Sequence, residues 1–318
     1  MKTAVIYVFS GTGNTLITAD MLKRHLASSG IKVNVHNIKT GEPYPLPDAF
    51  DYVGFAYPVY AYNIPEIFFR FVKSLPCASG KTAFILKTSG EPFSMNSVSS
   101  YLLIKLLRGK GFDVALEQHL LMPYNILFRY PDSLVKQMYL YSDALCAVLA
   151  KALVAGERSD FRFNPLRVFA SIIFRIQWPG ARLNGRLYSV NMKKCVKCMR
   201  CVKDCPERNI SFKGGRFRFS GRCVMCMRCA MLCPADAVNV GLVRFFKVSG
   251  AYEFNRLLRD ACVPADFINP NTKGYFRLFR TFFRNADITL SKHSIKVPVV
   301  YEADNNERCY DSGSDVWQ

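Results

Sequence analysis

The sequence lacks an uninterrupted apolar run long enough for a membrane-spanning helix. Such a helix needs about 18 or more apolar residues, and Lys or Arg interrupts each candidate stretch, as Arg175 does within residues 168–176. Residues 4–9 are too few for the apolar core of a signal peptide, and no small-residue cleavage pattern follows them. We therefore expect a cytoplasmic protein, with a peripheral position at the inner membrane surface as the alternative.

Acidic residues are scarce relative to basic ones. The chain has 43 Lys and Arg against 24 Asp and Glu, which gives a formal net charge of +19. Residues 151–250 hold 20 basic and 5 acidic side chains and therefore carry +15 of this charge. Such a concentration of positive charge favours partners with a negative surface.

Histidine is scarce too, which leaves few residues for acid-base or nucleophilic catalysis. The four histidines show neither metal-ligand spacing nor a pairing with a nucleophile: His25, His36, His119 and His293. No hydrolytic triad is proposed, and paired-carboxylate catalysis has no signature here. The sequence therefore nominates no catalytic residue and identifies no small-molecule substrate.

Cysteine, by contrast, is abundant, with 12 residues. Because the cytosol keeps thiols reduced, we expect metal ligation rather than disulfides. Eight of the cysteines form two runs of the pattern C-x2-C-x2-C-x3-C-P, 28 residues apart: Cys195, Cys198, Cys201, Cys205 and Cys223, Cys226, Cys229, Cys233. The repeat indicates a duplicated module. The other four have no such spacing, and we assign them no role: Cys77, Cys146, Cys262 and Cys309.

Both runs resemble those of bacterial ferredoxins that hold two [4Fe-4S] clusters. In such proteins the fourth Cys of each run ligates the other cluster. The resemblance implies one cluster on Cys195, Cys198, Cys201 and Cys233, and a second on Cys223, Cys226, Cys229 and Cys205. A pair of zinc sites is the alternative, although zinc knuckles usually pair over a longer gap and lack the Cys-Pro endings.

Strand and helix patterns alternate through the first 125 residues. Residues 3–9 are continuously apolar, which suits a strand buried on both faces of a parallel sheet. Leu16, Leu22 and Leu26 follow at helical spacing, and Gly30 ends that helix. Further strand candidates are residues 32–38, 52–57, 81–87 and 113–119. The alternation predicts an α/β fold with a doubly wound parallel sheet.

The loop between the first strand and the first helix has the composition of a phosphate site. It consists of Ser10, Gly11, Thr12, Gly13, Asn14 and Thr15. Its glycines let the backbone approach a ligand closely, and its hydroxyl and N–H groups lie at a helix N-terminus. It lacks both the Lys of a nucleoside-triphosphate loop and the third Gly of a dinucleotide fingerprint. An empty strand-to-helix turn is the alternative.

This loop resembles the flavodoxin pattern Ser/Thr-x-Thr-Gly-x-Ser/Thr, which holds the phosphate of FMN. In that fold the flavin lies outside the carboxyl ends of strands one and three. The resemblance implies flavin contacts from the loops after the third and fourth strands: Pro58, Val59, Tyr60, Ala61, Tyr62 and Asn63, then Thr88, Ser89 and Gly90. Either Tyr60 or Tyr62 stacks on the flavin, or both only cap the packing of their loop.

The order of parts resembles the flavodoxin-ferredoxin fusion proteins called EFR-family ferredoxins. The likeness covers roughly residues 1–245, and Met122-Pro123-Tyr124-Asn125 within it and Tyr252 beyond it also resemble that family. It implies a flavodoxin-like FMN-binding domain followed by a small α+β two-[4Fe-4S] ferredoxin domain. The expected boundaries are 1–155 for the first, 156–190 for a basic aromatic linker, 191–243 for the second and 244–318 for a C-terminal extension with an acidic tail.

Arginine and aromatic residues are interleaved in the linker and again in residues 275–284. Pro165 and Pro179 bracket a short predicted helix in the linker. Such segments either lie on a membrane surface, bind nucleic acid, or pack between domains with their Arg heads in water. We expect packing for the linker. The acidic residues 302–315 are expected to form a solvated tail.

Together these patterns predict an electron-transfer protein that uses FMN, two [4Fe-4S] clusters and a redox partner. Each cluster exchanges one electron at a time, whereas FMN takes one or two. The combination therefore connects one-electron reactions with two-electron reactions. A flavin-dependent oxidoreductase fed by the clusters is one alternative, and an iron-sulfur sensor or nucleic-acid-binding protein is another. We favour an acidic redox protein as partner over an anionic membrane surface, because no long apolar face accompanies the Cys runs. Nucleic acid is not favoured.

Overall fold

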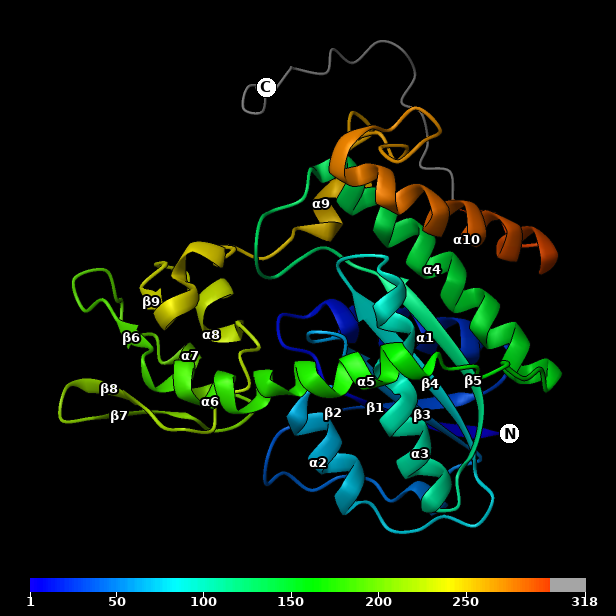
Figure 1. Ribbon diagram of the computed structural model, residues 1–318, viewed down its shortest axis with the longest axis horizontal. Helices are drawn as coiled ribbons and strands as arrows, with labels where there is room; N and C mark the ends of the chain where they lie inside the picture. Colours follow the sequence, from blue (N-terminus) through cyan, green and yellow to red (C-terminus); the bar gives the residue numbers. More distant parts are fainter. Residues whose placement is uncertain (298–318) are drawn as a thin grey trace.

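The structure, a computed structural model, describes residues 1–297. Figure 1 shows an α/β domain, a smaller Cys-rich region (residues 189–239) at one side of it, and a C-terminal segment (residues 241–297) against one of its helices. The acidic stretch expected as a tail, and Cys309, lie outside the described residues.

Alternate residues of the first strand are buried on opposite faces of the central sheet. Ala4, Ile6 and Val8 belong to one core cluster, whereas Val5 and Tyr7 belong to another, and none of the five has exposed surface. A strand that is covered on both faces needs such a continuous apolar run.

Five parallel strands form the sheet in the order β2-β1-β3-β4-β5. Their bounds are β1 (Thr3–Val8), β2 (Lys32–Asn37), β3 (Tyr52–Pro58), β4 (Thr82–Ser89) and β5 (Asp113–Leu121). This order is the flavodoxin-like doubly wound arrangement. The predicted fold class is therefore confirmed, and each strand begins within one residue of its predicted start.

Helices cover both faces of the sheet. Helices α1 and α4 share a core cluster on one face, and α2 and α3 share the cluster on the other. The bounds are α1 (Asn14–Ser28), α2 (Glu66–Ser74), α3 (Tyr101–Gly109) and α4 (Asp132–Ala155), with short 3-10 turns η1 (Pro47–Ala49) and η2 (Ser94–Ser100). The carboxyl ends of the strands are left to the loops, where ligands bind in folds of this kind.

Helix α4 is long and apolar enough to cross a membrane by length and composition alone. The sequence did not predict it as a membrane candidate, because Lys136, Asp143 and Lys151 interrupt its apolar residues. In the fold, 61% of its most apolar window is buried, and the helix packs against α1, β5 and the C-terminal segment. The core helix of a folded domain has the same composition, and the burial of α4 places it in that class.

The linker forms an almost continuous helical run that extends toward the Cys-rich region (Figure 1). It comprises α5 (Pro165–Ile173), η3 (Phe174–Ile176) and α6 (Gln177–Arg186). Asn164 caps its start, because its Oδ1 atom accepts a hydrogen bond of 3.1 Å from the Arg167 backbone. Pro179 does not end the run as predicted, since it lies in the first turn of α6, where a missing N–H is tolerated.

The Cys-rich region folds as two similar halves. Its elements are β6 (Ser189–Val190), α7 (Arg200–Lys203), β7 (Ile210–Lys213), β8 (Arg216–Phe219), α8 (Arg228–Met231) and β9 (Val238–Asn239). Strand β6 pairs with β9 and β7 with β8, both antiparallel. Six non-glycine residues have positive φ, as three pairs that are each 28 residues apart: Lys197 and Met225, Met199 and Met227, Arg208 and Asp236. The repeat in the sequence is thus also a repeat of backbone conformation.

The C-terminal segment is held to α4 by two buried polar side chains. Lys136 Nζ donates hydrogen bonds of 2.7 Å to the carbonyl oxygens of Asp260 and Val263. The Gln137 amide exchanges two hydrogen bonds with the Ile268 backbone, at 2.7 and 3.0 Å. The elements of this segment are η4 (Gly241–Phe246), α9 (Phe254–Arg259), η5 (Gly274–Phe279) and α10 (Arg280–Lys292).

Candidate functional site

A cleft of about 410 Å³ lies at the carboxyl ends of the sheet strands. This volume falls within the range of small-molecule and cofactor sites. Thirteen of the fifteen residues expected to contact a flavin line it: Ser10, Gly11, Thr12, Asn14, Thr15, Pro58, Val59, Tyr60, Ala61, Tyr62, Thr88, Ser89 and Gly90. Gly13 and Asn63 are not among its lining residues.

The loop after β1 is arranged to present backbone N–H groups to an anion. Gly13 adopts a φ of 117°, and its N–H donates to Ser10 Oγ at 3.1 Å. Thr15 Oγ1 and Thr88 Oγ1 lie 2.7 Å apart in a buried hydrogen bond that joins this loop to the end of β4. Among the described residues no side chain caps the start of α1, and its first turn has no acidic residue. The helix N-terminus therefore remains a site for phosphate.

The loop after β3 turns sharply beside the cleft. Ala61 and Tyr62 have positive φ, and the backbones of Tyr60 and Asn63 exchange two hydrogen bonds of 2.9 Å across the turn. Asn63 Nδ2 donates to the carbonyls of Ala61 and Ser171, at 2.9 and 2.8 Å. Asn63 thus supports the turn and fixes it to α5, which explains why its side chain does not face the cleft.

The two tyrosines of this turn have different surroundings. The Tyr60 ring packs edge-on to Phe9, and its buried Oη atom has no hydrogen-bond partner among residues 1–297. Burial raises the pKa of Tyr60 well above its usual value. Tyr62 is half-buried at the cleft, and its ring lies 5.0 Å from that of Phe174 in the linker. Tyr60 and Tyr62 both line the cleft, and Tyr62 is the one whose ring also contacts the linker.

Polar groups fix the loop after β4. Ser89 Oγ lies 2.8 Å from His119 Nε2, and Asn96 Nδ2 donates to Ser89 Oγ at 3.1 Å and to the Glu91 carbonyl at 2.7 Å. Burial, aided by the charge of Lys87, lowers the pKa of His119 to about 3, so its ring is neutral at physiological pH. The loop is therefore held in place by uncharged hydrogen bonds.

Aromatic side chains close this end of the cleft. A Cβ atom at Gly90 would lie 2.2 Å from the Tyr124 ring, so only glycine permits that contact. Tyr130 donates to the Gly90 carbonyl at 2.9 Å, and Tyr275 of the C-terminal segment donates to Glu91. The C-terminal segment thus reaches the cleft.

Several lining residues come from distant segments of the chain, and the sequence patterns did not predict them. Phe174 and Gln177 belong to the linker, and Met225 belongs to the second Cys run. No local pattern marks them. The motif Met122-Pro123-Tyr124-Asn125, noted for its resemblance, also lines the cleft, together with Glu91, Phe93, Asn96, Ile126 and Leu127.

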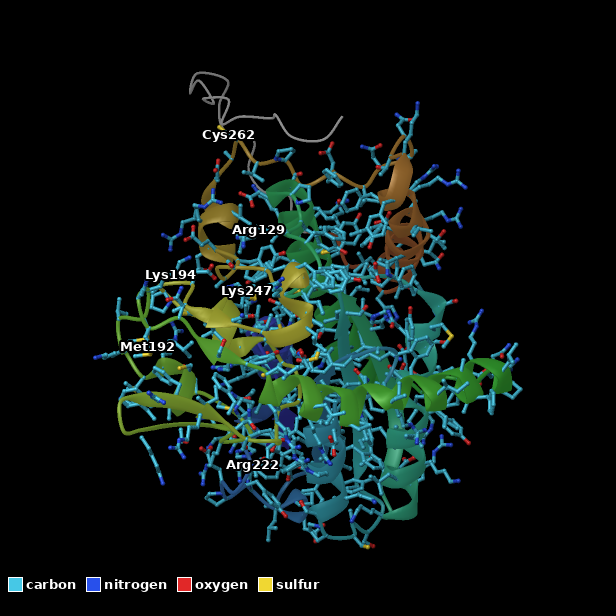
Figure 2. All side chains as sticks on the ribbon, turned by 60° about the vertical axis from the view of Figure 1, so that its left-hand side comes forward. Arg129, Met192, Lys194, Arg222, Lys247 and Cys262 are labelled. Carbon is cyan, nitrogen blue, oxygen red and sulfur yellow. The ribbon has the colours of Figure 1, made fainter. Side chains whose placement is uncertain are left out.

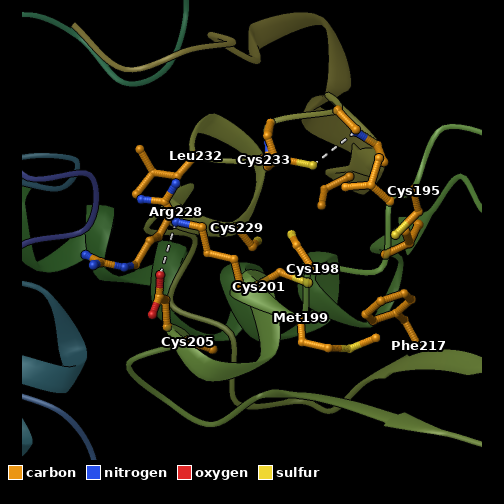
Figure 3. A pocket seen from close by; sticks show the side chains of 18 residues that line it. Cys195, Cys198, Met199, Cys201, Cys205, Phe217, Arg228, Cys229, Leu232 and Cys233 are labelled. Atoms are coloured by element: carbon orange, nitrogen blue, oxygen red, sulfur yellow. Dashed lines mark hydrogen bonds and ion pairs between the residues drawn. The ribbon is translucent and has the colours of Figure 1, made fainter. Parts of the chain in front are cut away.

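The eight cysteines of the two runs surround two cavities. Six of them line the first (Figure 3): Cys195, Cys198, Cys201, Cys205, Cys229 and Cys233. The cavity nearest to the α/β domain is lined by Cys205, Cys223, Cys226 and Cys229. The second cavity thus combines three thiols of the second run with the fourth thiol of the first, and the first cavity takes thiols of both runs.

Most thiols of the two runs are partly buried, and they are crowded together. Within residues 1–297 no three His, Cys, Asp or Glu side chains converge as the ligands of a single metal ion would. Burial raises the pKa of Cys226 to about 12, and the neighbouring Cys223 and Cys205 add to the shift. Burial likewise raises the pKa of Cys201 to about 11, with Cys195 as the main neighbour. Such crowded thiols ionise together only where positive charge close by compensates them.

Backbone N–H groups point at the thiol sulfurs in the same way in both runs. The N–H groups of Lys197 and Met225 donate to Cys195 and Cys223, each at 3.4 Å. The N–H groups of Asn209 and Ala237 donate to the fourth thiol of each run, Cys205 and Cys233, each at 3.3 Å. Such hydrogen bonds stabilise thiolates and adjust cluster potentials.

The second Cys run lies directly against the loop after β1. Arg228 Nη1 donates to the carbonyls of Gly11 and Ser10, at 3.0 and 3.4 Å. A Cβ atom at Gly11 would lie 2.6 Å from the Cys226 carbonyl oxygen and 2.8 Å from Tyr60 Oη. The candidate phosphate loop and the candidate second cluster site are therefore in van der Waals contact.

Gly11→Ala should consequently damage both sites. The added methyl group forces apart backbone atoms that cannot move independently, and we expect the free energy of unfolding to fall by about 1–3 kcal/mol. Urea unfolding measures this change. Gly109→Ala is the matched control, because its Cβ atom meets nothing within 4 Å, and it should be neutral or slightly stabilising. Equal stability of the two variants would disprove the close contact.

A buried carboxylate also joins the Cys-rich region to the α/β domain. Glu207 is 2% exposed, accepts a hydrogen bond of 2.8 Å from Thr40 Oγ1 and pairs with Arg70. The Thr40 N–H donates to the Pro206 carbonyl at 2.9 Å. These contacts fix the end of the first Cys run to the α/β domain.

Removing the charge of Glu207 should loosen this junction. We expect Glu207→Gln to lower the free energy of unfolding by about 1–3 kcal/mol, less than for a fully buried pair because Arg70 is partly exposed. Thermal or urea unfolding tests it. Asp160→Asn is the control: Asp160 pairs with Arg162 at 2.6 Å in an exposed position, where a change within about 0.5 kcal/mol is expected. A similarly small change in the free energy of unfolding of both variants would show that Glu207 does not stabilise this junction.

Among known proteins, only solved structures resemble this chain. No protein-family model matches the chain, and no curated protein matches it. A short-chain flavodoxin associated with a non-canonical PDU bacterial microcompartment aligns with 49% of this chain and 98% of its own, at 15% identity and a TM-score of 0.37. A flavodoxin of Streptococcus pneumoniae TIGR4 aligns with 48% of this chain and 98% of its own, at 16% identity and a TM-score of 0.35. Oxidised flavodoxin 1 from Bacillus cereus covers 45% and 96%, at 19% identity and a TM-score of 0.34.

Proposed function

We propose that this protein transfers electrons, with FMN in the cleft and two [4Fe-4S] clusters on the Cys runs. The observation that carries the proposal is the contact between Gly11 of the candidate phosphate loop and Cys226 of the second run. A flavin site and a cluster site in contact suit electron exchange within one chain. When bound, FMN accepts one or two electrons and each cluster exchanges one, so together they connect one-electron and two-electron reactions.

The residues of the cleft have distinct tasks in this proposal. Ser10, Thr12 and Thr15, with the N–H groups at the start of α1, would hold the phosphate. Tyr62 would cover one face of the ring system, and the tightly packed Gly90 would let the backbone approach it. Phe174, 43% exposed, limits the access of water at the mouth of the cleft.

The residues around the thiols complete the proposal. Cys195, Cys198, Cys201 and Cys233 would ligate the first cluster, and Cys205, Cys223, Cys226 and Cys229 the second. The paired backbone donors stabilise the thiolates. Arg228 adds a positive charge between the second site and the phosphate loop, and nearby positive charge favours the reduced form of a cluster. The second site is thus the one closest to the cleft.

Anaerobic purification followed by cofactor analysis tests this proposal. We expect about eight iron and eight acid-labile sulfide atoms per chain, from two four-iron centres. We also expect one FMN per chain. Bound zinc without sulfide would refute the cluster assignment, and a chain that binds clusters but never FMN would refute the flavin assignment. Turnover of a small substrate, faster than electron transfer to a protein, would favour the flavin-dependent oxidoreductase instead.

A further inference from the structure

One side of the linker helices carries a row of exposed apolar side chains. Leu166, Phe169, Ile173, Ile176, Leu183 and Leu187 form this row, which we name the linker stripe, and they are between 53% and 75% exposed. Their spacing of 3, 4, 3, 7 and 4 residues keeps them on one side of a helical run about 33 Å long. Soluble surfaces rarely leave such a continuous apolar patch uncovered.

The opposite side of the same helices is packed against the α/β domain. Trp178 stacks at 5.6 Å on Phe69, and the Ser171 carbonyl accepts a hydrogen bond of 2.8 Å from Asn63. Arg182 pairs with Glu66 of α2. These contacts fix the rotation of the helices, so the linker stripe is held outward. The expectation that the linker packs between domains is thus met on one side of it only.

Positive charge surrounds the linker stripe. Residues 161–203 contain ten Lys and Arg and no Asp or Glu. Past the end of α6, the exposed Met192 and Val196 alternate with Lys193, Lys194 and Lys197. Figure 2 shows Met192 and Lys194 at the same outer edge of the molecule. Large apolar side chains bordered by cations are the composition of helices that lie in the surface of an anionic bilayer.

We infer that the linker stripe docks on an anionic phospholipid membrane, with its apolar side chains in the headgroup region and the neighbouring Lys and Arg on lipid phosphates. A second copy of the chain fits less well, because pairing two stripes would bring two regions of +15 together. An acidic protein would complement the positive charge of the linker, but it would place carboxylates against the exposed Leu and Ile side chains. Docking would bring the first Cys run, next to Lys193 and Lys194, close to the bilayer.

Vesicle flotation of the full chain tests this inference independently of its cofactors. The chain should float with vesicles of phosphatidylglycerol and phosphatidylcholine but not with phosphatidylcholine alone, and added salt should weaken the binding. The double variant Phe169→Ser/Ile173→Ser should bind roughly 100-fold more weakly, from the lost transfer of two apolar side chains. Ile288→Ser on α10 is the control, since Ile288 is 63% exposed and lies outside the stripe; its binding should be unchanged.

Three results would overturn the inference. The first is a wild-type chain that does not float with anionic vesicles. The second is binding that salt abolishes but the double variant leaves intact, because the charge alone would then explain it. The third is a dimer in analytical ultracentrifugation that the double variant dissociates, because the stripe would then bind a second copy. Unchanged thermal unfolding of the double variant, expected for exposed positions, excludes misfolding as the cause of lost binding.

Discussion

The double variant Cys205→Ser/Cys223→Ser should retain one complete [4Fe-4S] cluster. Both cysteines line the cavity nearest to the α/β domain, although they belong to different runs. If that cavity holds one cluster, the two substitutions damage the same centre. Bound iron should therefore fall from about eight to about four atoms per chain, and sulfide with it.

The matched double variant Cys195→Ser/Cys205→Ser removes two cysteines of a single run. Because the predicted ligand sets assign Cys195 to the first cluster and Cys205 to the second, both clusters should be lost and bound iron should approach zero. Cys77→Ser, an exposed cysteine outside both runs, should keep the full content. The reverse outcome, with one cluster surviving in Cys195→Ser/Cys205→Ser and none in Cys205→Ser/Cys223→Ser, would show that each run holds its own cluster.

Thr12→Asp should weaken FMN binding by roughly 100-fold or more. Thr12 lines the cleft within the loop before α1, and a carboxylate there would lie close to the bound phosphate. At an effective dielectric constant of about 20, two unit charges 4 Å apart repel by about 4 kcal/mol. Quenching of flavin fluorescence on binding measures the affinity.

Thr12→Ser is the conservative control for this prediction. It keeps a hydroxyl that can accept the hydrogen bond from Asn125 Nδ2, which spans 3.4 Å, and adds no charge. We expect its FMN affinity to stay within a few-fold of the wild type. An unchanged affinity in Thr12→Asp would move the flavin phosphate away from this loop, and an equal loss in both variants would assign the effect to packing instead of charge.

The strands and the first loop could be predicted because their signals are local. A continuous apolar run such as residues 3–9 suits only a strand covered on both faces, and the glycines and hydroxyls that follow it need no distant partner to be recognised. The spacing of the Cys runs is equally local, and the 28-residue repeat reappears in the φ angles of Met199 and Met227.

The remaining parts of the cleft depend on contacts that no local pattern encodes. Phe174, Met225 and Tyr275 reach the cleft or its border from segments that lie far away in the sequence. Asn63 shows the opposite case: its place beside Tyr62 suggested a flavin contact, but its amide satisfies the backbone of its own turn and of α5. The sequence did not predict the linker stripe for a related reason. The side of this Arg-rich and Phe-rich helix that faces outward is set by the packing of Trp178 on the α/β domain.

Electron-spin relaxation of the flavin radical, measured in variants that keep one cluster, tests the account most directly. Cys195→Ser should lose the first cluster and keep the second, which adjoins Gly11, so the flavin radical should still relax quickly. Cys223→Ser should keep only the first cluster, and the relaxation should slow markedly toward that of the flavin alone. Equal relaxation in the two variants, or slow relaxation in Cys195→Ser alone, would contradict a second cluster in contact with the flavin cleft.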